Sequence, residues 1–150
     1  MTARTLTHPA EPAGHEGEPT MANLTILSFG YLYGTPEATV TVDVREVLRD
    51  PHIDPALRYQ TTYDAPVRAK VAATRGALDL ANRLRDVAAV LSDLAQATGR
   101  PTSLAIGCAG GRHRSAALAM LIADDLAADG HPVTVNHLHI DRPVVERPAA

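Results

Sequence analysis

The chain has 150 residues, a length that suits one domain with a single hydrophobic core. Its formal net charge of -3 excludes an overall basic field of the kind that attracts nucleic acid, so any contact with RNA must be local. The single cysteine excludes an internal disulfide bond, and no His/Cys spacing indicates a structural zinc, so neither a metal nor a cofactor is expected. A reducing, cytoplasmic location without a membrane span or signal peptide is the corresponding expectation.

The first 20 residues are predicted to form a disordered tail. Proline, glycine and glutamate dominate their second half, and so few apolar residues cannot offset the entropy that ordering would remove. The globular domain is therefore expected to span residues 21–150. Met21 stands immediately before the first apolar run and is an alternative start of the native chain.

Two short strands are predicted next. The first is "LTILSF" at 24–29, which Gly30 stops, and the second is "ATVTVDVR" at 38–45, where β-branched and polar residues alternate. Residues 46–64 carry two prolines and no sustained period, which predicts a long loop. Loops of that length in compact domains are often functional.

Helices and strands alternate over the rest of the chain. Residues 66–97 are predicted to form one long helix or a helix pair, and "TSLAIGC" at 102–108 a buried strand. A further helix is predicted over 113–129, and "PVTVNHLHI" at 132–140 is predicted as the last strand. This order indicates an α/β fold, with helices packed on a small open sheet and right-handed crossovers.

The loop after the strand that ends at Cys108 is predicted to bind an anion. A strand, two glycines and a helix start place backbone N–H groups and the positive end of a helix dipole around one concave spot. The candidate ligands are Gly110, Gly111, Arg112, His113, Arg114 and Ser115. Only one of the two arginines is expected to face inward, because residues two apart on an incipient helix point in different directions. A tight turn around an unreactive buried cysteine is the structural alternative.

The same loop belongs to a set of four segments that share an order and a spacing. They are "SFGYLYGTP" at 28–36, "VDVREVLRDPH" at 42–52, "LRYQTTYDAPV" at 57–67 and "AIGCAGGRHRS" at 105–115. Together they resemble the C-terminal domain of the RNase adapter protein RapZ family over roughly residues 24–141. Larger members of that family carry a nucleotide-binding domain with a Walker A loop. The present chain has no Walker A pattern, so ATP binding is not implied.

The resemblance implies a domain that senses glucosamine-6-phosphate, binds small regulatory RNAs and self-associates. It also implies a sugar-phosphate site composed of Gly110, Gly111, His113 and Arg114, with His52 from the long loop. The chain departs from the family pattern at four places, which are Leu32 for Lys, Asp50 for Asn, Ala109 for Thr and Leu138 for Arg. The change at Ala109 removes a hydroxyl ligand, and the weak basic character of the C-terminus lessens the case for RNA.

Charged residues of neighbouring segments are further candidates for the site. Asp43 and Arg45 end a predicted strand two residues apart, so they either reach the usual ligand position of an open α/β sheet or form a structural ion pair. Arg58 and Asp64 belong to the loop expected over the site, or they are solvated charges.

Two histidines alternate along the last predicted strand. His137 and His139 would therefore share one face, which could begin a metal site. No third ligand is evident, so no metal is expected, and RNA contact or ordinary exposure is favoured for both side chains.

Three functions stay open. The favoured one is a regulatory domain that binds a phosphorylated small molecule, and the second is an RNA-binding or protein-binding adapter module. The third is a cysteine-dependent phosphatase, because Cys108 precedes Arg114 and Ser115 at the spacing such enzymes use. The acid of that mechanism would be one of three carboxyl groups, those of Asp43, Asp54 and Asp64.

Overall fold

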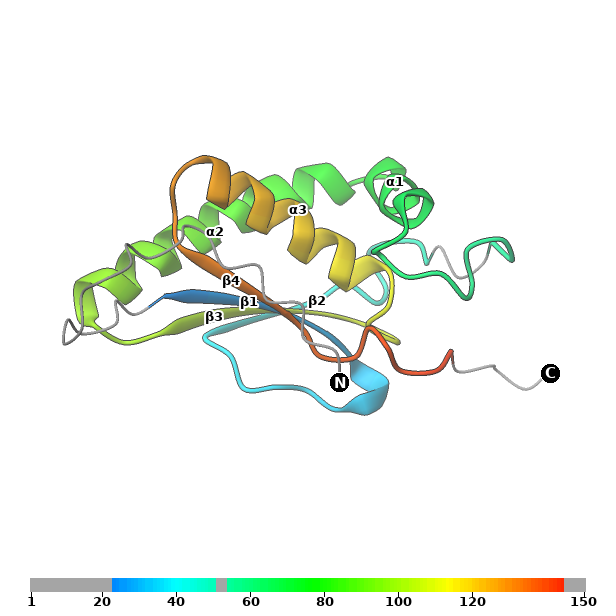
Figure 1. The fold of residues 1–150 in the computed structure, drawn as a ribbon, viewed down its shortest axis with the longest axis horizontal. Coiled ribbons are helices and arrows are strands. Elements are labelled where there is room, and N and C mark those ends of the chain that lie inside the picture. Colours follow the sequence, from blue (N-terminus) through cyan, green and yellow to red (C-terminus); the bar gives the residue numbers. More distant parts are fainter. Residues whose placement is uncertain (1–22, 51–53, 145–150) are drawn as a thin grey trace, which may run out of the picture.

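The computed structural model describes residues 23–50 and 54–144, in which an open, parallel sheet lies against helices (Figure 1). The strands are β1 (Leu24–Gly30), β2 (Val40–Asp43), β3 (Thr102–Cys108) and β4 (Val133–His137), in the order β2-β3-β1-β4. The helices are α1 (Ala65–Ala73), α2 (Ala77–Thr98) and α3 (Arg114–Ala128), and a short 3-10 helix, η1 (Tyr31–Tyr33), follows β1. The predicted α/β class is confirmed.

All strands run in the same direction, so their carboxyl ends meet at one edge of the sheet. Gly30 pairs with Cys108, Asp43 pairs with Gly107, and the last residue of β4 lies beside Ser28. The three helices lie on one face of the sheet in Figure 1. This arrangement places the loops after all four strands at one end of the molecule.

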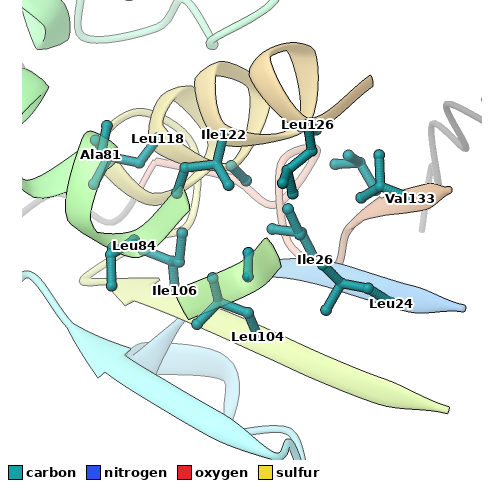
Figure 2. Packing of buried hydrophobic residues seen from close by; sticks show 14 of the residues in the cluster. Leu24, Ile26, Ala81, Leu84, Leu104, Ile106, Leu118, Ile122, Leu126 and Val133 are labelled. Carbon is teal, nitrogen blue, oxygen red and sulfur yellow. The ribbon is translucent and has the colours of Figure 1, made fainter. Parts of the chain in front are cut away.

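The main core fills the space between the sheet and helices α2 and α3 (Figure 2). Alternate strand residues such as Leu24 and Ile26 point toward the helices, which is the period expected of a pleated strand. Leu118 and Ile122 of α3 cover them, and the alanines of α3 allow the helix to approach the sheet closely. A smaller cluster attaches α1 to α3 through Val67, Val71, Leu57 and Ala117.

Several element boundaries differ from the prediction. The long helical segment is a pair, because the chain breaks at Gly76, whose φ of 83° favours glycine. The last strand ends at His137, and the chain turns over residues 138–142 instead of continuing as a strand to residue 140. The predicted tail at 1–20, Met21 and His52 lie outside the described residues.

The second strand is also shorter than predicted. Before it, side-chain hydroxyl groups replace the usual pairing with β3. The backbone N–H of Thr39 and that of Ser103 each donate to the other residue's hydroxyl oxygen at 3.0 Å. After it, the N–H of Val44 still donates to the carbonyl of Gly107 at 2.9 Å, and a turn then begins at Arg45.

Candidate functional site

Two glycines bring the loop after β3 into direct backbone contact with the end of β1. Gly111 has a φ of 76°, and a Cβ atom there would lie 2.7 Å from the nitrogen of Gly30. A Cβ atom on Gly30 would lie 2.4 Å from the carbonyl carbon of Gly110. Both positions therefore require glycine. Gly110 differs, because a Cβ atom on it would meet nothing within 4 Å.

The thiol of Cys108 is buried at the start of this loop, with 2% of the residue exposed. Its Sγ lies 3.2 Å from the Oγ of Ser115 and accepts the N–H of Gly111 at 3.3 Å. The Ser115 hydroxyl also donates to the carbonyl of Phe29 at 3.2 Å. The cysteine and serine thus join β3, β1 and the first turn of α3.

Arg114, the first residue of α3, anchors the loop after β2. It is 4% exposed, and its Nη1 donates to the carbonyls of Arg45 at 2.7 Å and Leu48 at 3.1 Å. Its Nη2 donates to the carboxylate of Asp50 at 3.2 Å. The guanidinium group is therefore largely occupied by protein acceptors.

Arg112 and His113 anchor a different segment. Arg112 donates to the carbonyls of Tyr59 at 2.7 Å and Arg142 at 2.9 Å, and its own carbonyl accepts the N–H of Thr62. The Nε2 of His113 lies 2.6 Å from the carbonyl of Gln60. The two arginines point in different directions, as predicted, and each fixes a separate loop.

Main-chain donors stay available in the same loop. Neither the N–H of Gly110 nor that of Arg112 donates to another residue within 23–50 and 54–144. The 15-residue helix α3 also begins without a side-chain cap. Backbone N–H groups at a helix N-terminus favour a negatively charged group, so this loop is chemically suited to hold a phosphate.

Asp43 and Arg45 form an ion pair at the edge of the sheet. The guanidinium group of Arg45 donates to both carboxylate oxygens, with the shortest contact at 2.7 Å, and it stacks on the ring of Tyr31 at 3.7 Å. The hydrogen bond from Arg45 lowers the pKa of the Asp43 carboxyl below its ordinary value. An ionised Asp43 is a poor general acid, and the structural ion pair considered for these residues is confirmed.

The expectation that His137 and His139 are exposed is wrong. They are 1% and 7% exposed, because β4 ends between them and the turn folds His139 back over β1. The Nδ1 of His137 lies 2.6 Å from the hydroxyl of Ser28, and the Nδ1 of His139 accepts the N–H of Gly30 at 2.9 Å. Among the described residues, no group of three His, Cys, Asp or Glu side chains could hold a metal ion.

The burial of His139 should make the stability of the domain depend on pH. Burial, and then the charge of Arg142, lower the pKa of His139, so the unfolded chain binds its proton more readily than the folded one. The free energy of unfolding should therefore decline as the pH falls below about 6.5, the ordinary pKa of histidine. Urea unfolding at neutral and mildly acidic pH should show a smaller decline for His139→Gln, and an equal decline would contradict this explanation.

The remaining predicted site residues are Asp54, Arg58 and Asp64, which lie outside the loop after β3. The carboxylate of Asp64 accepts the N–H of Thr61 at 2.9 Å, and that of Asp54 accepts the N–H of Ala56 at 3.0 Å. The Nε of Arg58 is buried and has no hydrogen-bond partner among the described residues. The hydrogen bond between Gly30 and His139 was not predicted, because the two residues lie 109 positions apart and no local pattern connects them.

Comparison with known proteins places the chain in a family. The sequence model of the RapZ C-terminal domain matches residues 22–141. A nucleotide-binding protein of Nitratidesulfovibrio vulgaris is 42% identical over 118 residues, which are 77% of this chain and 39% of that protein. The nucleotide-binding protein TTHA0319 of Thermus thermophilus is 40% identical over 121 residues, 79% of this chain and 43% of that protein.

The chain spans about two fifths of the length of these curated relatives. In the part of the chain that the structure describes, no helix combines the length and apolar character needed to cross a membrane. The family match over residues 22–141 includes all four motif segments. The chain belongs to the RapZ C-terminal domain family.

Proposed function

We propose that the domain binds the phosphate group of a small molecule at the loop formed by residues 108–114. The observation that carries the proposal is the pair of available main-chain donors on Gly110 and Arg112, beside open space at Gly110 and the start of α3. These donors, together with the helix dipole, suit a dianionic phosphate. An amino-sugar phosphate such as glucosamine-6-phosphate is the ligand that family membership favours.

The arginines of the loop have a supporting role in this proposal. Their guanidinium groups bond main-chain carbonyls of the loops around residues 45–48 and 59–60, so they hold the backbone donors in place before a ligand arrives. A preformed site loses less conformational entropy on binding. Their positive charges also make the electrostatic potential at the loop more positive, which favours the binding of an anion.

Regulation would follow from the same contacts. The side chains of the same loop bond residues 45–50 and 59–62. A phosphate that shifts the loop backbone would therefore alter the surface formed by those segments. An RNA or protein partner that recognises this surface would then respond to the ligand. A ligand shifts such an equilibrium only as far as its affinities for the two states differ.

The proposal can be tested by calorimetric titration of glucosamine-6-phosphate into the protein and into two variants at one position. Gly110→Ala has room for its methyl group and should bind normally. Gly110→Asp has the same backbone requirement but places a carboxylate beside the donors, so its affinity should fall by about tenfold or more, since like charges repel. Unphosphorylated glucosamine is the control ligand and should give no saturable heat.

Equal affinities for the two Gly110 variants would contradict a phosphate site at this loop. A phosphatase is a second candidate, because the N–H of Gly111 and the hydroxyl of Ser115 both lie at the Cys108 sulfur. Turnover would appear in the same titration as power that continues after each injection, and Cys108→Ser would abolish it.

A further inference from the structure

A hollow lined by three cationic side chains lies away from the loop at Cys108. It has a volume of about 820 Å³ and lies between the loop after β2 and the junction of α1 and α2. Three cationic side chains line it, and they come from three places in the chain. Arg49 belongs to the loop, Lys70 to the last turn of α1, and Arg75 to the turn before α2.

These three cations lack neutralising partners. All three residues are exposed, and within residues 23–50 and 54–144 none of them forms an ion pair with a carboxylate. Asp50 and Asp54 also line the hollow. Asp50 is bound by the guanidinium group of Arg114 at 3.2 Å, so the three cations outnumber the one carboxylate that remains, that of Asp54. Three like charges around one concavity repel each other, and a bound anion would remove that repulsion.

The start of α2 forms part of the same wall. Gly76 lines the hollow and is the N-cap of this 22-residue helix, with a φ of 83° and no side-chain cap. The positive end of the helix dipole therefore lies at the hollow as well. This end is separate from the start of α3, which belongs to the loop after Cys108.

We infer that this hollow binds an anion with two or three adjacent phosphate groups. A single phosphate could engage one or two of the cations, whereas a polyphosphate chain can reach all three and the helix start. The volume lies in the range of small-molecule sites, about 300–1,000 Å³. Inorganic polyphosphate and the diphosphate of a nucleotide share this chemistry.

The test is a calorimetric titration of inorganic tripolyphosphate into the full chain. Lys70→Gln combined with Arg75→Gln removes two of the three positive charges and should weaken binding by about tenfold or more. Arg83→Gln is the matched control, since Arg83 is an exposed arginine of α2 that does not line the hollow. It should bind tripolyphosphate as the wild-type chain does.

Gly110→Asp separates this inference from the proposed phosphate site of the loop. Tripolyphosphate should bind that variant normally, even where glucosamine-6-phosphate no longer does. Loss of tripolyphosphate binding in Gly110→Asp, or undiminished binding in the Lys70/Arg75 variant, would overturn the inference. With the site confirmed, tighter binding of ADP than of pyrophosphate would assign a nucleotide as the source, and equal affinity would assign the inorganic anion.

Discussion

Replacing Gly111 by alanine is expected to destabilise the domain strongly. A non-glycine residue at a φ of 76° is strained, and the added methyl group would lie 2.7 Å from the nitrogen of Gly30 and 2.9 Å from the carbonyl carbon of Phe29. Strain of this kind and overpacking cost about 1–3 kcal/mol each, so the free energy of unfolding should fall by about 2–6 kcal/mol. Urea unfolding followed by circular dichroism measures the change.

The neighbouring glycine supplies the matched control. Gly110→Ala meets no atom within 4 Å, so its free energy of unfolding should stay within about 0.5 kcal/mol of the wild type. If the two alanine variants unfold at the same urea concentration, the close backbone approach between the loop and β1 does not make glycine at position 111 necessary for stability.

The second large effect is expected for Arg114→Met, which keeps the length of the side chain but removes its donors. The carbonyls of Arg45 and Leu48 and the carboxylate of Asp50 would each lose the hydrogen bond that Arg114 donates. Breaking a buried charge pair in this way costs about 3–5 kcal/mol, and partial exposure of Asp50 favours the lower end. Hydrogen exchange should also accelerate in residues 45–50.

Arg83→Met provides the comparison for this variant. Arg83 lies exposed on α2, and no residue in the described part of the chain forms an ion pair with it. Its replacement should change the free energy of unfolding by less than about 0.5 kcal/mol. A similar small change for Arg114→Met would show that its contacts with the loop after β2 are dispensable.

The elements of the fold were predictable because their signals are local. Short β-rich or apolar runs indicated the strands, and glycines followed β3, α2 and α3. The order of the strands was not predictable in this way. β3 lies between β1 and β2, and that choice depends on which faces the strands bury against α2 and α3.

The sequence indicated which residues form the loop after β3, but not what their side chains contact. The sequence around Cys108 indicated a loop with glycines and cations, and residue type shows which groups can donate a hydrogen bond. It does not show which acceptors are near. The carbonyls that accept hydrogen bonds from Arg112 and Arg114 include those of residues 30 and 69 positions away. The burial of His139 depends on a turn after β4.

The central claim is that backbone N–H groups of the loop after β3 hold a phosphate. The most direct measurement is the change in amide chemical shifts when glucosamine-6-phosphate is added to ¹⁵N-labelled protein. The account predicts that the amides of Gly110 and Arg112 move most and saturate together, with smaller changes in the first turn of α3. Saturable shifts confined to other parts of the chain, with these two amides unmoved, would contradict it.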